Sequence, residues 1–133
     1  MNALTQKVSF SKNLARLFYA IAATDKRVHE AEVRSMKRLI QTSWSDILEQ
    51  KNNEPIDQIY QIELEFKRLV EENSDPIECF DDFIDFKEKN QAQFDQDINE
   101  LIWKTANAIV HAFSGKNKSE LILLTKLKMN LQQ

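Results

Sequence analysis

The sequence predicts an all-α fold, because glycine and proline are rare, apolar residues recur at helical spacing, and no segment alternates as a half-buried strand would. The 133 residues include one glycine and two prolines. Sheet proteins need glycine for their many tight turns, whereas helices need it only at their ends. The length fits one domain, and 42% hydrophobic residues can fill its core. We therefore expect a single-domain bundle of about six helices over residues 1–133.

Six apolar stripes define the expected helices in chain order. The first helical pattern begins at Phe10 and the second near His29; a polar stretch, 49–54, then interrupts the pattern. The third begins at Pro55, a residue favoured in a first helical turn. The fourth has the strongest start signal, with Asp75 as N-cap and Pro76 at the first helical position. The six stripes are Phe10, Leu14, Leu17, Phe18 and Ile21; Val33, Met36, Ile40 and Trp44; Ile59, Ile62, Phe66, Leu69 and Val70; Ile77, Phe80, Phe83 and Ile84; Phe94, Ile98, Leu101, Ile102, Thr105, Ile109 and Phe113; and Leu121, Leu124, Leu127 and Leu131. Residues predicted to be in the core are Phe18, Ile21, Met36, Ile102, Ile109 and Leu124.

An internal repeat joins the two ends of the chain. Residues 19–39 align without a gap on residues 107–127, with four identical positions. Each copy has the pattern of a helix, a short turn and a second helix. The repeat therefore predicts two αα-hairpins related by a pseudo-twofold axis.

The first copy resembles a known family. Residues 20–32, Ala-Ile-Ala-Ala-Thr-Asp-Lys-Arg-Val-His-Glu-Ala-Glu, are similar to the hallmark of the TerB-like family of tellurite-resistance proteins. The resemblance implies an all-helical domain linked to stress responses, whose acidic positions are proposed to bind cations. Two departures weaken a symmetrical two-site arrangement, because Lys26 replaces the family's glycine and Phe113 occupies the position of Asp25 in the second copy.

The best candidate for a chemical site is a divalent-cation site formed by Asp25, His29 and Glu32. His29 and Glu32 are three positions apart on a helix and so share one face. The alternative is structural: with His29 as N-cap, the Glu32 carboxylate can reach back to its backbone N–H, as in a capping box. Asn117 and Glu120 have the same spacing in the second copy. One capping role explains both glutamates, and nearby Lys and Arg residues oppose cation binding, so we favour capping.

The charges are unevenly distributed along the chain. The net charge is −3, yet residues 49–100 contain 16 acidic and 5 basic residues, and the two flanks contain 13 basic and 5 acidic ones. Complementary faces speed and orient association. We therefore predict a docking face for a basic surface of the same or another protein at Asp81, Asp82, Asp85 and Glu88. Nucleic acid is not an expected partner, because the pI is near 5.4.

Other function classes find little support in the sequence. Cys79 is the one cysteine and is expected in the core. The apolar run 17–23 is too short for a bilayer, which needs about 20 residues, so the expected location is the cytoplasm. No glycine-rich loop or nucleophile–base pairing indicates an enzyme. The predicted function is a non-catalytic helical interaction or stress-response module with a protein partner or self-association, and the alternative is a cation-binding domain.

Overall fold

The computed structural model describes residues 3–24, 27–51, 55–113 and 118–132, and almost all of them are helical. This part of the chain contains six α-helices, one short 3-10 turn and no strand, which confirms the predicted all-α class. The elements are α1 (Ala3–Ala23), α2 (Glu30–Lys51), α3 (Pro55–Glu71), α4 (Pro76–Lys89), η1 (Gln91–Gln93), α5 (Gln96–Phe113) and α6 (Lys118–Leu131). Within these residues, no helix is both long and apolar enough to cross a membrane.

The predicted helix starts are largely confirmed. α3 begins at Pro55, and Asp75 is the N-cap of α4. The Asp75 Oδ1 atom accepts a hydrogen bond from the backbone N–H of Ile77 at 2.9 Å. Two boundaries differ from the prediction. α1 begins at Ala3 rather than Phe10, and α2 continues to Lys51 through part of the polar stretch, because Glu, Gln and Lys favour helix even where they bury nothing.

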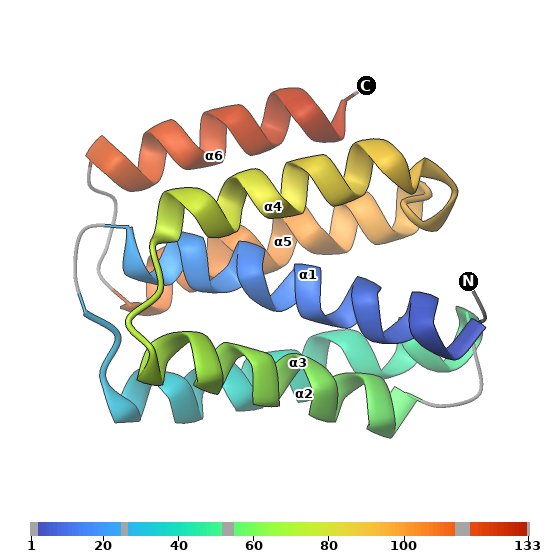
Figure 1. The fold of residues 1–133 in the computed structure, drawn as a ribbon, viewed down its shortest axis with the longest axis horizontal. Helices are drawn as coiled ribbons and strands as arrows, with labels where there is room; N and C mark the ends of the chain where they lie inside the picture. The colour runs from blue at the N-terminus through green and yellow to red at the C-terminus, as the bar shows by residue number, and fades with distance from the viewer. Residues whose placement is uncertain (1–2, 25–26, 52–54, 114–117, 133) are drawn as a thin grey trace.

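The helices are arranged around α1 (Figure 1). α1 lies between the pair α2 and α3 on one side and α4 with α5 on the other, and α6 lies at the outer edge, where it packs against α5. From Phe10 to Ala23 nearly every α1 side chain is buried, with Lys12 exposed and Arg16 half-buried. A helix that is apolar on almost all sides needs neighbours on all sides. α1 is therefore the centre of one continuous hydrophobic core.

The corner between α3 and α4 is tightly fixed. Asn73 has a positive φ of 50°. Its backbone N–H donates to the Val70 carbonyl at 3.1 Å, and the Ser74 N–H donates to the Leu69 carbonyl at 3.1 Å, which is a Schellman motif. The Tyr19 hydroxyl of α1 donates to the Ser74 carbonyl at 2.6 Å. This bond anchors the corner, and with it the start of α4, to the central helix.

All six predicted core residues are buried, whereas two residues of the predicted stripes are exposed. Ile77 is 52% exposed and Leu121 is 44% exposed. Ile77 lies in the first turn of α4. The buried face of α6 passes through Leu123 and Leu127, which leaves Leu121 on the side toward solvent.

The two copies of the sequence repeat each span the end of one helix and the start of the next. Their pseudo-twofold relation stays a prediction.

Candidate functional site

The predicted cation site lies where α2 begins. Asp25 falls outside the described residues, so only His29 and Glu32 can be located. His29 directly precedes α2, and its carbonyl accepts the backbone N–H bonds of Glu32 at 2.9 Å and Val33 at 3.1 Å. The Glu32 Oε1 atom accepts the backbone N–H of His29 at 2.9 Å. This reciprocal arrangement is the carboxylate half of a capping box, as the structural alternative predicted.

The second copy of the repeat has a similar glutamate. Glu120 is the third residue of α6 and is almost completely buried. Asn117, its expected cap partner, lies outside the described residues. Across the described ranges, no three His, Cys, Asp or Glu side chains are close enough together to hold a metal ion. The geometry of the described residues therefore assigns Glu32 a capping bond.

Substitution of Glu32 separates the two roles. We expect Glu32→Gln to leave the melting temperature nearly unchanged, because the amide oxygen can still accept the His29 N–H. Glu32→Ala should cost about 1 kcal/mol, the typical loss of a helix cap. If Glu32 is a cap, added Mg²⁺, Ca²⁺ or Zn²⁺ should not shift the melting temperature of the wild type. A cation that binds only the folded state would raise that temperature. A cation-dependent rise that disappears in Glu32→Gln would make Glu32 a ligand.

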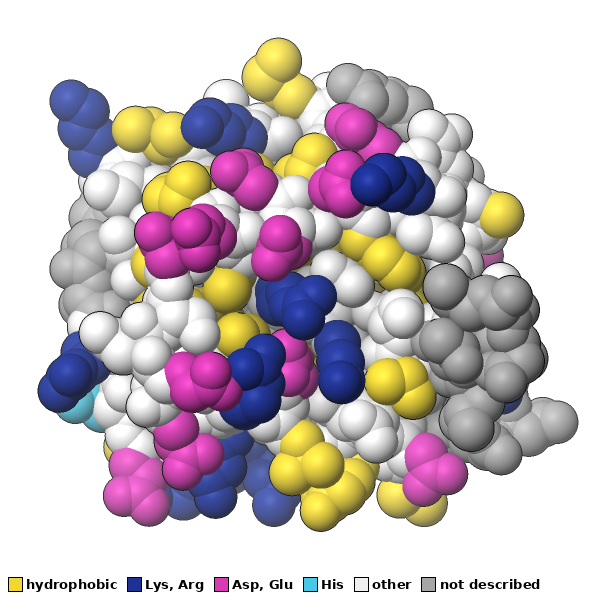
Figure 2. All heavy atoms as spheres, in the orientation of Figure 1, with side chains coloured by type: hydrophobic (Ala, Val, Ile, Leu, Met, Phe, Trp, Pro, Cys, Tyr) yellow, Lys and Arg dark blue, Asp and Glu magenta, His cyan; other side chains and the backbone are white. Residues whose placement is uncertain are grey.

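The predicted acidic face lies on the outside of α4. Asp81, Asp82, Asp85 and Glu88 are all exposed, whereas Phe80 and Phe83 on the same helix are buried. Asp85 forms an ion pair with Lys89 at 3.0 Å. Figure 2 shows acidic side chains gathered along α4 and lysine and arginine side chains over α1 and α3 beside it. The carboxylates are thus presented to solvent by a helix whose other side is fixed in the core.

A nearly buried ion pair, which was not predicted from the sequence, lies between α1 and α3. The Glu65 side chain is 4% exposed. Arg68 donates to both of its oxygens, at 2.8 Å and 2.7 Å, and Arg16 of α1 lies 3.4 Å from one of them. The hydrogen bonds from Arg68 lower the pKa of the Glu65 carboxyl. The spacing of Glu65 and Arg68 is visible in the sequence, but nothing there indicates the contact with Arg16.

Three other side chains carry groups that can react or titrate: Cys79, Lys87 and His111. Cys79 is a buried free thiol, and burial raises its pKa to about 11, so it is not poised as a nucleophile. Lys87 is also buried, and burial lowers the pKa of its ammonium group. Its Nζ donates to the Asn130 carbonyl near the end of α6 at 3.4 Å. His111 is exposed on α5.

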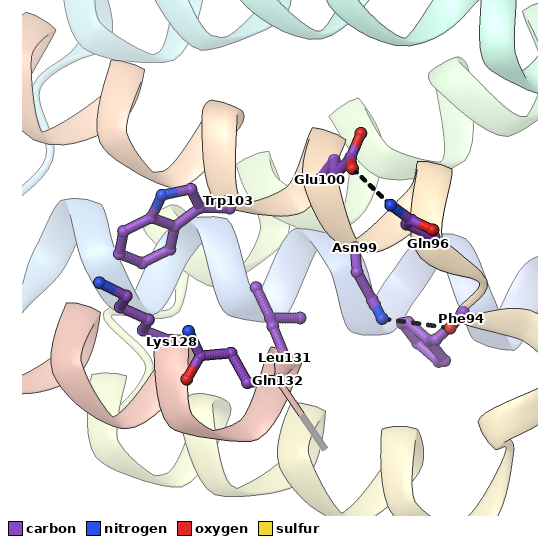
Figure 3. A pocket seen from close by; sticks show the side chains of 8 residues that line it. All are labelled: Phe94, Gln96, Asn99, Glu100, Trp103, Lys128, Leu131 and Gln132. Carbon is purple, nitrogen blue, oxygen red and sulfur yellow. Dashed lines mark hydrogen bonds between the residues drawn. The ribbon is translucent and has the colours of Figure 1, made fainter.

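A groove runs between α5 and α6 (Figure 3). Its volume is about 520 Å³. Trp103 of α5 and Lys128 of α6 extend toward each other across it, and its remaining lining residues are Phe94, Gln96, Asn99, Glu100, Leu131 and Gln132. Of the described residues that line it, none is Ser, Thr, Cys or His. The groove thus has an amphipathic lining in which the carboxylate of Glu100 and the ammonium group of Lys128 are the charged groups.

A smaller groove of about 280 Å³ separates α2 from α3. It has an apolar floor and a charged rim, and it is bordered by an exposed apolar row on α3. This row, which was not predicted from the sequence, lies on α3 beside the buried stripe of the same helix. Its spacing of four residues from Ile56 to Tyr60 to Leu64 was the available signal.

A scan of the chain against protein-family models gave no match, and searches of curated proteins and of solved structures gave none either. The class of protein defined here is therefore structural: an all-α bundle around a buried first helix, with charged and apolar faces on its surface. The similarity of residues 20–32 to TerB-like proteins stays a prediction.

Proposed function

We propose that this chain is a non-catalytic helical interaction module that binds a basic protein surface through the acidic face of α4. The observation that carries the proposal is the exposure of Asp81, Asp82, Asp85 and Glu88 on one rigidly held helix. Surface ion pairs within one molecule contribute little to stability, often under about 1 kcal/mol each. A concentration of charge on one face is therefore better explained by association, which it speeds and orients.

The wider setting of this module follows from the TerB-like resemblance. We propose a cytoplasmic stress-response role, of which tellurite resistance is the family's general example. Divalent-cation binding by Asp25, His29 and Glu32 is the alternative function. It is less favoured because the Glu32 carboxylate already accepts a backbone hydrogen bond.

The acidic face can be tested with a matched pair of variants. One variant replaces Asp81, Asp82, Asp85 and Glu88 by Asn and Gln. The control replaces four exposed acidic residues of α2 and α5 in the same way: Asp46, Glu49, Asp97 and Glu100. Both raise the net charge equally, so they differ only in where the charge is removed. Neither should change the melting temperature much, because all eight side chains are exposed.

Binding is then measured against a labelled Lys-rich helical peptide, and self-association is measured by sedimentation. At low salt the α4 variant should bind the peptide about tenfold or more weakly than the control variant does, because the local potential is lost. The difference should shrink as salt is raised and the charges are screened. Equal binding by the two variants at every ionic strength contradicts an α4 docking face.

A further inference from the structure

The groove between α2 and α3 has the chemistry of a binding surface. Its floor is formed by buried apolar side chains, among them Met36 and Ile40 of α2 and Ile62 and Phe66 of α3. Tyr60 and Leu64 line its α3 side and are 56% and 44% exposed. An apolar floor continuous with exposed apolar walls is typical of sites that hold a partner, because solvation of such a patch is unfavourable.

α3 has two apolar faces, and only one of them is covered. Ile59, Ile62, Phe66 and Leu69 are buried in the core. The second row consists of Ile56, Tyr60 and Leu64, spaced at i, i+4 and i+8, and Ile56 is 80% exposed. Residues at this spacing lie above one another on one side of a helix. The row therefore presents an apolar ridge on one side of α3, and two of its three residues, Tyr60 and Leu64, line the groove.

The charges on the rim are mainly basic. Lys37 of α2 and Lys67 of α3 line the groove and are both exposed. The acidic residue of the lining is Glu63, whose carboxylate accepts a hydrogen bond from Gln41 Nε2 at 3.1 Å. Burial raises the pKa of this carboxyl, and Lys37 and the Gln41 hydrogen bond oppose that shift. The groove thus combines an apolar ridge with a rim that attracts carboxylates.

We propose that the α2–α3 groove binds an amphipathic helix of a second protein. Apolar residues of that helix at i, i+4 and i+7 pack along Tyr60 and Leu64, and acidic residues beside them face Lys37 and Lys67. An amphipathic helix laid in a groove is a recurrent mode of recognition, and it uses this spacing of anchors. The surface is separate from the acidic face of α4, so the chain has two docking faces that select partners of opposite charge.

The exposed faces of the chain's other helices favour a different protein as the occupant. In the described part of the molecule, the exposed side of α4 is acidic, with Ile77 as its large exposed apolar residue. The exposed side of α6 has apolar residues, Leu121, Ile122 and Met129, but its charges at Lys118, Lys126 and Lys128 are basic. The α4 face has one large exposed apolar residue rather than a row, and the charges of the α6 face are basic, so neither matches the row of apolar anchors flanked by carboxylates that the groove selects.

A pair of synthetic helical peptides tests the proposal directly. Both carry Leu at i, i+4 and i+7; one has Glu at the flanking positions and the other has Lys. Fluorescence anisotropy is measured on the full chain without the α4 carboxylates, so that the acidic face cannot capture the Lys peptide, and it should show the Glu peptide binding at least about tenfold more tightly than the Lys peptide. Tyr60→Ser with Leu64→Asn should weaken the Glu peptide by about tenfold or more, because the apolar contact is lost. Lys37→Glu with Lys67→Glu should reverse the preference between the two peptides.

Matched changes on α6 provide the control. Leu121→Asn with Met129→Ser removes as much exposed apolar surface from a different helix, and Lys126→Glu with Lys128→Glu reverses as much charge. These variants should bind the Glu peptide like the wild type. The proposal is overturned if the two peptides bind equally, if the α6 variants lose as much affinity as the α3 variants, or if sedimentation shows a wild-type dimer that Leu64→Asn dissociates. The last result would mean that a second copy covers the ridge. The variant without the α4 carboxylates should retain peptide binding, so failure of one proposal is distinguishable from failure of the other.

Discussion

Replacing Trp44 with alanine is expected to lower the free energy of unfolding by about 3–5 kcal/mol, the usual range for a buried tryptophan. Trp44 of α2 is completely buried, and its ring lies 6.0 Å from that of Phe18 in α1, centroid to centroid. Its Nε1 atom donates to the Thr105 hydroxyl of α5 at 3.0 Å. The substitution leaves a cavity where α1, α2 and α5 meet. It also removes the N–H group that donates to the Thr105 hydroxyl. Urea unfolding monitored by circular dichroism measures the loss.

Two control variants test whether the loss of stability comes from the burial and the hydrogen bond of Trp44. Trp103→Ala removes an indole of equal size from the half-buried edge of the α5–α6 groove, and it should cost only about 1–2 kcal/mol. Thr105→Val keeps the volume but removes the acceptor for the Trp44 N–H, with a cost of about 1–3 kcal/mol for an unsatisfied buried donor. Equal losses for Trp44→Ala and Trp103→Ala would contradict the burial on which the prediction rests.

Glu65→Ala is expected to cost about 2–3 kcal/mol. Breaking a fully buried ion pair typically costs 3–5 kcal/mol, but about half of the Arg68 side chain is exposed, so solvent screens part of the interaction. The control is Glu72→Ala, which removes a carboxylate that accepts from the same arginine at 2.6 Å but is 55% exposed. That change should cost under about 1 kcal/mol. A Glu65 variant no less stable than the Glu72 variant would show that the burial of Glu65 contributes nothing.

The contribution of Glu65 should also depend on pH in a defined direction. Hydrogen bonds from Arg68 place the pKa of the folded carboxyl below its ordinary value of 4.5. The unfolded chain therefore binds this proton more readily than the folded chain does, and stability from this group falls as the pH is lowered. The difference in stability between wild type and Glu65→Ala should be constant above pH 4.5 and should shrink as the pH falls through the folded value.

Helices and their ends could be predicted from the sequence because the interactions that define them are local. The bond from the Ile77 N–H to Asp75, and that from the His29 N–H to Glu32, each join residues no more than three positions apart. Apolar spacing reports which residues can share a helical face, and all six predicted core residues are indeed buried. The capping role of Glu32 was visible for the same reason.

Exposure could not be predicted so well, because it depends on which helices cover a face. Ile77 and Ile59 are equally apolar, yet Ile77 is half exposed and Ile59 is buried. The ridge of Ile56, Tyr60 and Leu64 has helical spacing like a core stripe, and only the packing of α3 shows that no described helix covers it. The contact between Arg16 and Glu65 joins residues far apart in the sequence, and no local pattern encodes it. The exposure of the acidic face of α4 was easier to predict, because carboxylates are rarely buried without partners.

The position of α1 at the centre of the bundle has a consequence for synthesis of the protein. α1 precedes the other described helices and so leaves the ribosome before them, yet α4 and α5, which lie against it, are made later. Until they arrive, the apolar sides of α1 that they cover have no native partner. A nascent chain at this stage exposes the kind of surface that drives aggregation and recruits chaperones. Mutations that weaken α5 should therefore harm the yield of folded protein more than their effect on the stability of the finished molecule suggests.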